Sequence, residues 1–213
     1  MTIPRGGQYH LVLSDNTEVW LNSESQLKYP VNFIEGKVRE VELVYGEAYF
    51  EVSPSVKNGG AKFKVRVKLQ VIEVFGTEFN VKSYKDESKT YTTLVHGKVA
   101  INLDTKSYPL LPNYQAVLSN EDNLINFERV DVYSETSWKD GVFSFRNKSL
   151  MEVMKVLSRW YDIDVIFENQ DLKRKKFKGV LGKNQNIEEI LLILKSSGSL
   201  KSYEINEEVI ILK

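Results

Sequence analysis

Short runs of alternating apolar and polar residues fill the chain from about residue 8 to about residue 127. Tyr9, Leu11 and Leu13 alternate with less apolar neighbours, turn-forming residues occupy 14–17, and a second apolar run follows at 18–21. Further runs stand at 39–43, 48–52, 63–67, 71–75, 78–81, 91–95 and 98–103, with glycines at turns between several of them. A period of two predicts strands with one buried face. We therefore predict an all-β region, built as a sandwich, a barrel or a solenoid-like stack.

The pattern changes to helical spacing after about residue 133. Apolar residues recur on one helical face, and Ser149 with Glu152 has the form of a capping box, which predicts a helix over about 149–161. A second helix is predicted after Asn186, which is a favoured N-cap residue and is followed three positions later by Glu189. The second part of the chain therefore contains helices that the first part lacks.

Strand-like runs surround the two predicted helices, at 142–145, 163–168, 177–181, 202–205 and 209–212. The resulting order, β-α-β-β-α-β-β, predicts a small α+β domain with two helices on one face of a mixed sheet. We expect an all-β domain over 1–135 and this α+β domain over 136–213, with a boundary near 130–137.

Composition narrows the possible functions. The chain has 213 residues, is 42% hydrophobic and balances 29 basic residues with 29 acidic ones. These values are ordinary for a soluble globular protein, and the zero net charge argues against nucleic acid as a partner. No apolar run approaches the roughly 18 to 20 residues of a membrane helix. Because a strand-like segment follows Met1 directly, without a leader, we expect further sequence upstream.

Candidate catalytic groups are few. There is no cysteine, and His10 and His96 lack the spacing of a zinc helix, so we expect no metal and no cofactor. Glu47 and Glu51 share a strand face, but four residues of extended strand span about 13 Å at about 3.3 Å per residue, which is too far for the usual carboxylate pair of glycoside cleavage. We interpret both as solvent-facing. No nucleophile elbow, phosphate loop or dinucleotide motif occurs, so we do not predict an enzyme.

A cluster of positive charge lies at Lys173, Arg174, Lys175 and Lys176, with Lys178 just beyond it. It is either a solvated loop that keeps a sheet edge from pairing or a docking patch for an acidic partner. A docking patch would act on the association rate more than on affinity.

The three tryptophans, Trp20, Trp138 and Trp160, lie beside strand or helix patterns, where aromatic residues usually fill a core. A sugar-binding platform is the alternative for each of them.

Several segments, taken in order, resemble the FecR family of periplasmic sigma-factor regulators. Residues 13–22 read Leu-Ser-Asp-Asn-Thr-Glu-Val-Trp-Leu-Asn, which is similar to the family's opening Leu-Pro-Asp-Gly-Thr-x-Val-Trp-Leu-Asn. The series continues with Ser25-x-Leu27-x-Tyr29-Pro30, Arg39-x-Val41-x-Leu43, Gly46 to Val52, Phe63 to Val65, Val74 to Val81 and Thr93 to Val99. The order of the segments carries the resemblance more than any one of them.

The second part of the chain has its own resemblance, carried by Trp138-x-x-Gly141-x-Phe143-x-Phe145, Leu157-x-Arg159-Trp160-Tyr161-Asp162 and Phe177-x-Gly179. It is similar to the C-terminal module of these regulators in Bacteroidetes. That module in turn resembles the signalling domain at the N-terminus of TonB-dependent transporters and secretins.

The departures from the family pattern are small. Asn16 and Asn113 stand where the family usually has glycine, and asparagine tolerates the left-handed backbone region, so we expect the turns to form. One additional residue lies between Leu43 and Gly46, which a β-bulge would absorb.

The resemblance implies the periplasmic region of an anti-sigma factor anchored in the inner membrane by one helix. A cytoplasmic segment absent from this chain would hold an extracytoplasmic-function sigma factor. The region would bind the N-terminal signalling domain of a TonB-dependent transporter for iron or a glycan, and a site protease would then release the sigma factor. It implies a regulator that binds a protein partner, not an enzyme.

Two surfaces are predicted to bind that partner. The terminal run 208–213 is a candidate edge for strand addition through Val209 and Ile211, with an internal strand as the alternative. The basic cluster at 173–176 is the second candidate surface. Rival functions are a carbohydrate-binding module and a glycan-cleaving enzyme.

Overall fold

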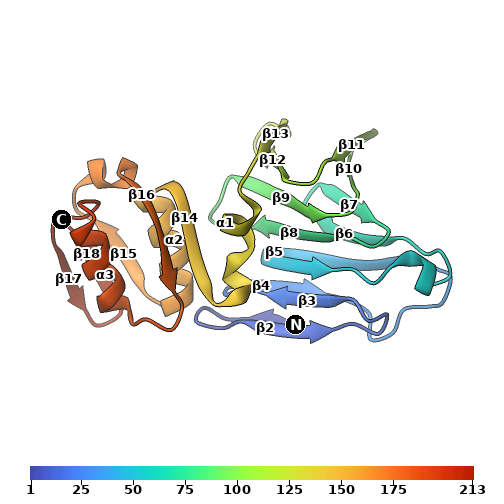
Figure 1. Ribbon diagram of the computed structural model, residues 1–213, viewed down its shortest axis with the longest axis horizontal. Coiled ribbons are helices and arrows are strands. Elements are labelled where there is room, and N and C mark those ends of the chain that lie inside the picture. The colour runs from blue at the N-terminus through green and yellow to red at the C-terminus, as the bar shows by residue number, and fades with distance from the viewer. The chain divides into compact units, whose positions relative to one another are not determined.

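The computed structural model describes residues 1–213, which divide into two compact units, Met1–Thr136 and Ser137–Lys213. The first unit is almost entirely strand and the second combines helices with short strands (Figure 1). The predicted fold class, a mainly β region followed by a small α+β region, is confirmed.

The first unit contains thirteen strands. They are β1 (Thr2–Ile3), β2 (Tyr9–Val12), β3 (Glu18–Leu21), β4 (Ser25–Lys28), β5 (Arg39–Glu51), β6 (Phe63–Val67), β7 (Gln70–Val74), β8 (Glu78–Ser83), β9 (Lys89–His96), β10 (Val99–Leu103), β11 (Lys106–Leu110), β12 (Tyr114–Ser119) and β13 (Ile125–Arg129). A short 3-10 turn, η1 (Ser55–Lys57), follows β5, and a one-turn helix, α1 (Val132–Thr136), ends the unit.

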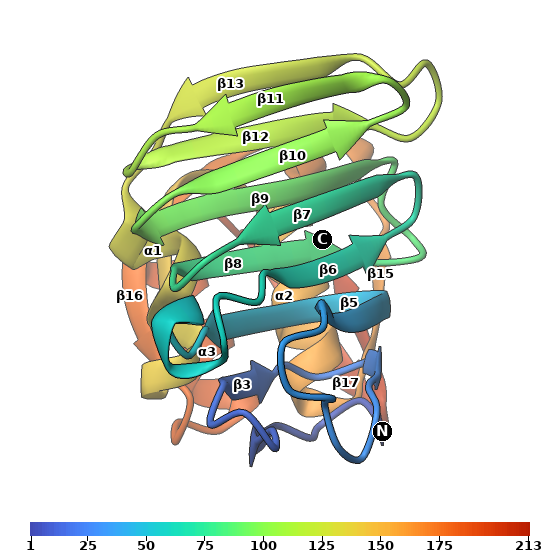
Figure 2. The same cartoon turned by 90° about the vertical axis from the view of Figure 1, so that its right-hand side faces the viewer.

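These strands form one curled sheet with the order β11-β10-β7-β6-β5-β8-β9-β12-β13, while β1 to β4 pair beside β5. The hairpins β6–β7, β8–β9, β10–β11 and β12–β13 alternate between two facing layers (Figure 2). The core between the layers is apolar and includes Phe50, Phe63 and Phe79, each fully buried. The curl lets one continuous sheet bury its own inner face, which a flat sheet of this width could not do.

The long strand β5 bends because it contains the predicted bulge. Gln26 pairs with Tyr45 and Leu27 with Leu43, so Val44 is the additional residue on the β5 side. Gly46 follows with φ +101°, and a Cβ atom there would lie 2.2 Å from Ser25 Oγ. Only glycine fits this backbone conformation and this close approach.

The turns that depart from the family pattern adopt the expected conformation. Asn16 and Asn113 have φ angles of 63° and 66°. The backbone of both residues is therefore in the left-handed region, which asparagine tolerates best among non-glycine residues. The predictions for these two turns are confirmed.

The second unit begins with a 3-10 turn and contains two main helices and five strands. Its elements are η2 (Ser137–Asp140), β14 (Val142–Ser149), α2 (Leu150–Tyr161), β15 (Asp164–Phe167), η3 (Gln170–Arg174), β16 (Lys176–Gly182), α3 (Ile187–Ser196), β17 (Tyr203–Asn206) and β18 (Val209–Leu212). Capping boxes start both helices, with Ser149 and Glu152 at α2 and with Asn186 and Glu189 at α3. Both helix predictions are confirmed.

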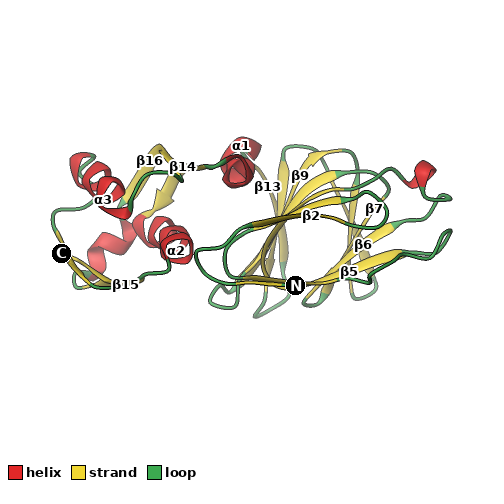
Figure 3. Cartoon of the chain, turned by 90° about the horizontal axis from the view of Figure 1, so that it is seen from below, coloured by secondary structure: helices red, strands yellow, loops and turns green.

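The strands of the second unit form two sheets rather than the single mixed sheet that we predicted. The antiparallel pair β14–β16 is one sheet, and the order β15-β18-β17 forms the other (Figure 3). Buried residues of α2 and α3 share one core with both sheets, among them Leu157, Leu191, Phe177 and Leu212. The helices cover the apolar faces of both sheets, so the two sheets need not join.

None of the helices is long enough and apolar enough to cross a bilayer.

Candidate functional site

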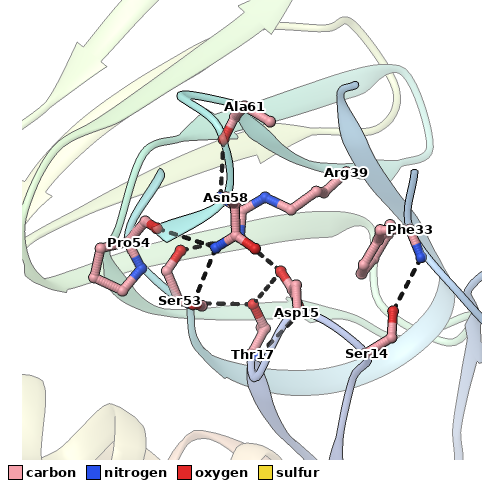
Figure 4. Close-up of polar contacts among 9 residues, drawn as sticks. All are labelled: Ser14, Asp15, Thr17, Phe33, Arg39, Ser53, Pro54, Asn58 and Ala61. Atoms are coloured by element: carbon pink, nitrogen blue, oxygen red, sulfur yellow. Dashed lines mark hydrogen bonds and ion pairs between the residues drawn. The ribbon is translucent and has the colours of Figure 1, made fainter. Parts of the chain in front are cut away.

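A buried ion pair lies at the centre of the first unit's polar contacts. Arg39, the first residue of β5, is 1% exposed, and its Nη1 donates to Asp15 Oδ2 at 2.6 Å (Figure 4). The same nitrogen donates to the Ser53 carbonyl at 3.0 Å, while Nη2 donates to the Ala61 carbonyl at 3.0 Å. The guanidinium also lies over the ring of Phe63. One arginine therefore joins a turn near the N-terminus to both ends of the 53–61 segment.

Neighbouring hydroxyl and amide groups complete this network. Thr17 donates its hydroxyl to Asp15 Oδ2 at 2.8 Å and accepts the backbone N–H of Ser53 at 3.1 Å. Asn58 donates to Ser53 Oγ and to the Pro54 carbonyl. These bonds hold the segment after β5 against the turn that contains Asp15, so both walls of the adjoining groove are fixed.

That groove encloses about 520 Å³. Its lining is polar and charged, comprising Asn16, Glu18, Glu51, Val52, Ser53, Pro54, Lys57, Gly76, Thr77, Glu78 and His96. Glu18, Glu51 and Glu78 stand directly opposite one another on three adjacent strands, and His96 is next in the row. Like charges in this arrangement repel.

Two contacts reduce the repulsion within the acidic groove. His10 Nε2 lies 2.9 Å from Glu18 Oε2, and the Tyr49 hydroxyl donates to Glu78 at 3.2 Å. The groove can attract a cation, but no group of three or more histidine or carboxylate side chains lies close enough to hold a metal ion.

Glu47 is buried, so its interpretation as a solvent-facing residue was wrong. Asn22 and Asn80 donate to its two carboxylate oxygens at 2.8 and 2.9 Å. Burial raises the pKa of Glu47 above its usual value, against the opposing effects of Lys82 and the two amides. Because Glu51 lines the groove while Glu47 is enclosed by amides, the two carboxylates do not form an acid–base pair.

The three tryptophans have different environments. Trp138 is buried, and Trp160 packs against the core of the second unit. Trp20 is partly exposed, and the ring of His10 stacks on it with 4.3 Å between ring centroids. The side chain of Lys183 lies among aromatic rings, 4.0 Å from the centroid of Trp160.

The predicted edge at Val209 and Ile211 was wrong, and its alternative, an internal strand, is confirmed. Strand β18 pairs in parallel with β15 and antiparallel with β17. Its backbone groups are therefore used on both sides. The error arises because the last strand of a chain need not be at a sheet edge, and pairing partners distant in sequence decide its position.

The predicted basic cluster lies in η3 and at the start of β16. Arg174, Lys175 and Lys176 are exposed, while Lys173 is half-buried with its ammonium over the ring of Phe167. Arg174 and Lys175 form no salt bridge, and Lys176 acts on Glu152 only through longer-range electrostatics. The structure therefore brings these cations together on one exposed segment, and their role in partner binding stays a prediction.

Two features escaped the sequence analysis. The Arg39–Asp15 pair was missed because each residue was treated only as part of a local motif. An arginine that begins a strongly apolar strand was the available signal. Strand β16 pairs with β14 alone, so its other edge is open. The sequence analysis considered a sheet edge beside the basic cluster but did not identify Lys178 and Val180 on it, although lysines at alternate strand positions are typical of edge strands.

Comparisons with known proteins match both units. Residues 1–100 match the FecR protein family, and residues 142–212 match the family described as FecR, C-terminal. Two crystal structures of a candidate anti-sigma factor from Parabacteroides distasonis ATCC 8503, at 1.65 and 2.50 Å resolution, are similar over the whole chain. Each is 27% identical to this chain, with TM-scores of 0.87 and 0.86, and each alignment covers 100% of this chain and 97% or 96% of the other. No curated protein matches.

Proposed function

The chain belongs to the FecR family of anti-sigma factors, and from this premise we propose that it is the periplasmic sensor region of a membrane-anchored regulator. The family is regulatory rather than enzymatic. In the proposed function, the region binds the N-terminal signalling domain of a TonB-dependent outer-membrane transporter. That binding controls an extracytoplasmic-function sigma factor, which a cytoplasmic segment of the full-length protein holds.

The observation that carries this proposal is the similarity to the crystal structure of a candidate anti-sigma factor, which covers 100% of this chain and so extends through both units. The organisation of each unit supports it. In the first unit the buried charge of Arg39 is satisfied internally by Asp15 and two backbone carbonyls, which suits a scaffold. The second unit exposes cations and strand edges, which suit a protein partner.

The proposed signal requires that partner binding change the access of a site protease to the full-length protein. A ligand shifts a conformational equilibrium only by its difference in affinity between the two states. The signalling domain must therefore bind one state of the region more tightly than the other.

The test uses the 213-residue chain and the signalling domain of the TonB-dependent transporter encoded beside its gene. We expect isothermal titration to give a dissociation constant of roughly 10 µM or tighter. A signalling domain from a transporter encoded elsewhere in the genome is the control, and we expect weaker binding to it. No heat of binding at roughly 100 µM of the cognate domain would contradict the proposed function.

A carbohydrate-binding module is the alternative function. The partly exposed ring of Trp20 is the side chain best suited to it, but the imidazole of His10 already occupies one face of that ring. A glycan array probed with the chain separates the two functions, since the sensor region is expected to leave the array unlabelled.

A further inference from the structure

Strand β16 has a free edge. It pairs with β14 and with no other strand. Beyond the end of the ladder, Lys183 N–H donates to the Gly141 carbonyl at 3.0 Å, in register with the pairing of Leu181 and Phe143. Because the bonded pairs of an antiparallel ladder alternate, Gly179 and Leu181 direct their backbone groups to β14. Beyond the bulge, Leu150 N–H donates to the Lys175 carbonyl at 2.7 Å, so Phe177 is again a bonded position, and Val180 and Lys178 direct their backbone groups away from β14.

The free edge has two defined ends. At one end, Ser199 Oγ donates to the Lys176 carbonyl at 3.4 Å, and at the other, Gln185 Oε1 accepts the N–H of Gly182 at 2.8 Å. Between these ends, the N–H and C=O groups of Lys178 and Val180 have no partner within the chain. The free edge therefore offers two backbone donors and two backbone acceptors to an added strand.

The side chains of β16 alternate between buried and outward-facing positions, and the outward ones can give an added strand its specificity. Phe177 and Leu181 point into the core and are buried. Lys176, Lys178 and Val180 point outward, and Val180 is 58% exposed. An added antiparallel strand would place one side chain opposite each of these three outward positions.

We propose that β16 is the docking edge of the region and that it takes an extended segment of the partner as an additional strand. This inference rests on the proposed function, in which the region binds a signalling domain. The occupant has an apolar residue opposite Val180 and acidic residues opposite Lys178 and Lys176. Backbone bonds to Lys178 and Val180 supply affinity, and the paired side chains supply specificity. The exposed Arg174 and Lys175 beside this edge would speed the encounter with an acidic segment.

The edge strands of the other sheet are β15 and β17, and charge distinguishes the β16 edge from the β17 edge. Strand β17 also pairs on one side only, but the charge of its Glu204 is neutralised by Lys213. By the same alternation, anchored by the bonds between Ser202 and Lys213, the N–H of Ile205 points away from β18. Ile205 is therefore the matched control position for Val180.

The test measures fluorescence anisotropy of a labelled peptide, acetyl-Thr-Val-Thr-Glu-Thr-Glu-Thr amide, added to the full 213-residue chain. We expect Val180→Pro and Lys178→Glu each to weaken binding by roughly tenfold or more, since one removes a backbone donor and the other reverses a charge. Ile205→Pro should change the affinity less than about twofold, because it lies outside the docking edge. A peptide with lysines in place of the glutamates should not bind.

Thermal denaturation shows whether each variant folds, and Lys178→Glu, an exposed surface change, tests the edge even if Val180→Pro does not fold. Binding that is unchanged in Lys178→Glu, or absent in the unmodified chain, overturns the docking edge and leaves the lysines as a device against strand pairing. The signalling domain is titrated against the same variants. If it binds all of them alike while the peptide discriminates, the edge stands but the signalling domain is not its occupant.

Discussion

Arg39 in the first unit and Lys178 in the second are both cations on strands, but their surroundings are opposite. Arg39 is 1% exposed and bonds to a carboxylate and two carbonyls, whereas Lys178 is exposed on a strand whose edge is open. A charge inside protein is retained only when its partners compensate for lost water, while a charge on an open edge stays hydrated until a partner arrives. The charge of Arg39 therefore fixes loops of the first unit, whereas the charge of Lys178 in the second unit is available for recognition.

Removing the buried Arg39–Asp15 ion pair should have the largest effect on stability. Arg39→Met should lower the free energy of unfolding of the first unit by about 3–5 kcal/mol, because Asp15 is left buried without its counter-charge. Chemical denaturation followed by tryptophan fluorescence measures this. The double variant Arg39→Met/Asp15→Leu should lose less than the sum of the two single variants. Strict additivity would show that the pair does not act as a unit.

The bulge in β5 should be the next most sensitive position. Gly46→Ala combines a φ of +101° with a Cβ placed 2.2 Å from Ser25 Oγ, so we expect a loss of at least about 3 kcal/mol. Gly36→Ala is the matched control, since Gly36 also has positive φ, +71°, but no atom within 4 Å of its added Cβ. It should cost only about 1 kcal/mol. Similar losses at both positions would remove the steric part of this explanation.

Ser149→Ala should destabilise the second unit alone, by about 1 kcal/mol, because the N-cap of α2 is lost. Although burial alone would raise the pKa of Glu152, hydrogen bonds from Ser149 bring it below its usual value of 4.5. A lowered folded-state pKa gives stability that is present above pH 4.5 and is lost as pH falls through the folded pKa. The effect of Ser149→Ala should therefore shrink in acid. An effect independent of pH would contradict the role of the capping carboxylate.

Glu47 should give the opposite dependence on pH in the first unit. Its raised pKa means that its contribution to stability is fully present below pH 4.5 and is lost as pH rises through the folded-state pKa. Denaturation curves from pH 4 to 8 should show this decline in the unmodified chain and a flatter profile in Glu47→Gln. If the two profiles run parallel, Glu47 is not the titrating group.

Removing the charges beside the docking edge should have the smallest effect on affinity. Arg174→Ser/Lys175→Ser should slow association with the signalling domain at low salt and change the binding free energy by less than about 1 kcal/mol. Stopped-flow kinetics at about 20 and 500 mM salt measure this, because screening shortens the Debye length to a few ångströms. If the association rate changes with neither the substitution nor the salt concentration, electrostatic steering by these residues is excluded.

Local signals made part of this fold predictable. The helices α2 and α3 follow from a cap and a carboxylate three residues apart, and the bulge before Gly46 follows from one additional residue. Pairing between distant strands could not be read from the sequence, which is why β18 was wrongly placed at an edge. Alternation shows which residues share a face but not whether that face is covered.

The face of β5 that carries Glu47 is an example. Asn80, Thr93 and Gln115 lie on the same face and are buried, although all three are polar. Gln115 donates to Glu135 of α1 at 3.3 Å, so a one-turn helix lies against this polar face. A helix this short has no periodic pattern of its own. The burial of Glu47 could therefore not be inferred from the residues around it.

Amide hydrogen exchange of the full chain, alone and saturated with the cognate signalling domain, tests the central claim most directly. We expect slower exchange at Lys178 and Val180 on binding, because their free N–H groups gain partners, and no change in the 53–61 segment held by Arg39. Protection confined to the acidic groove of the first unit, with β16 unchanged, would contradict it.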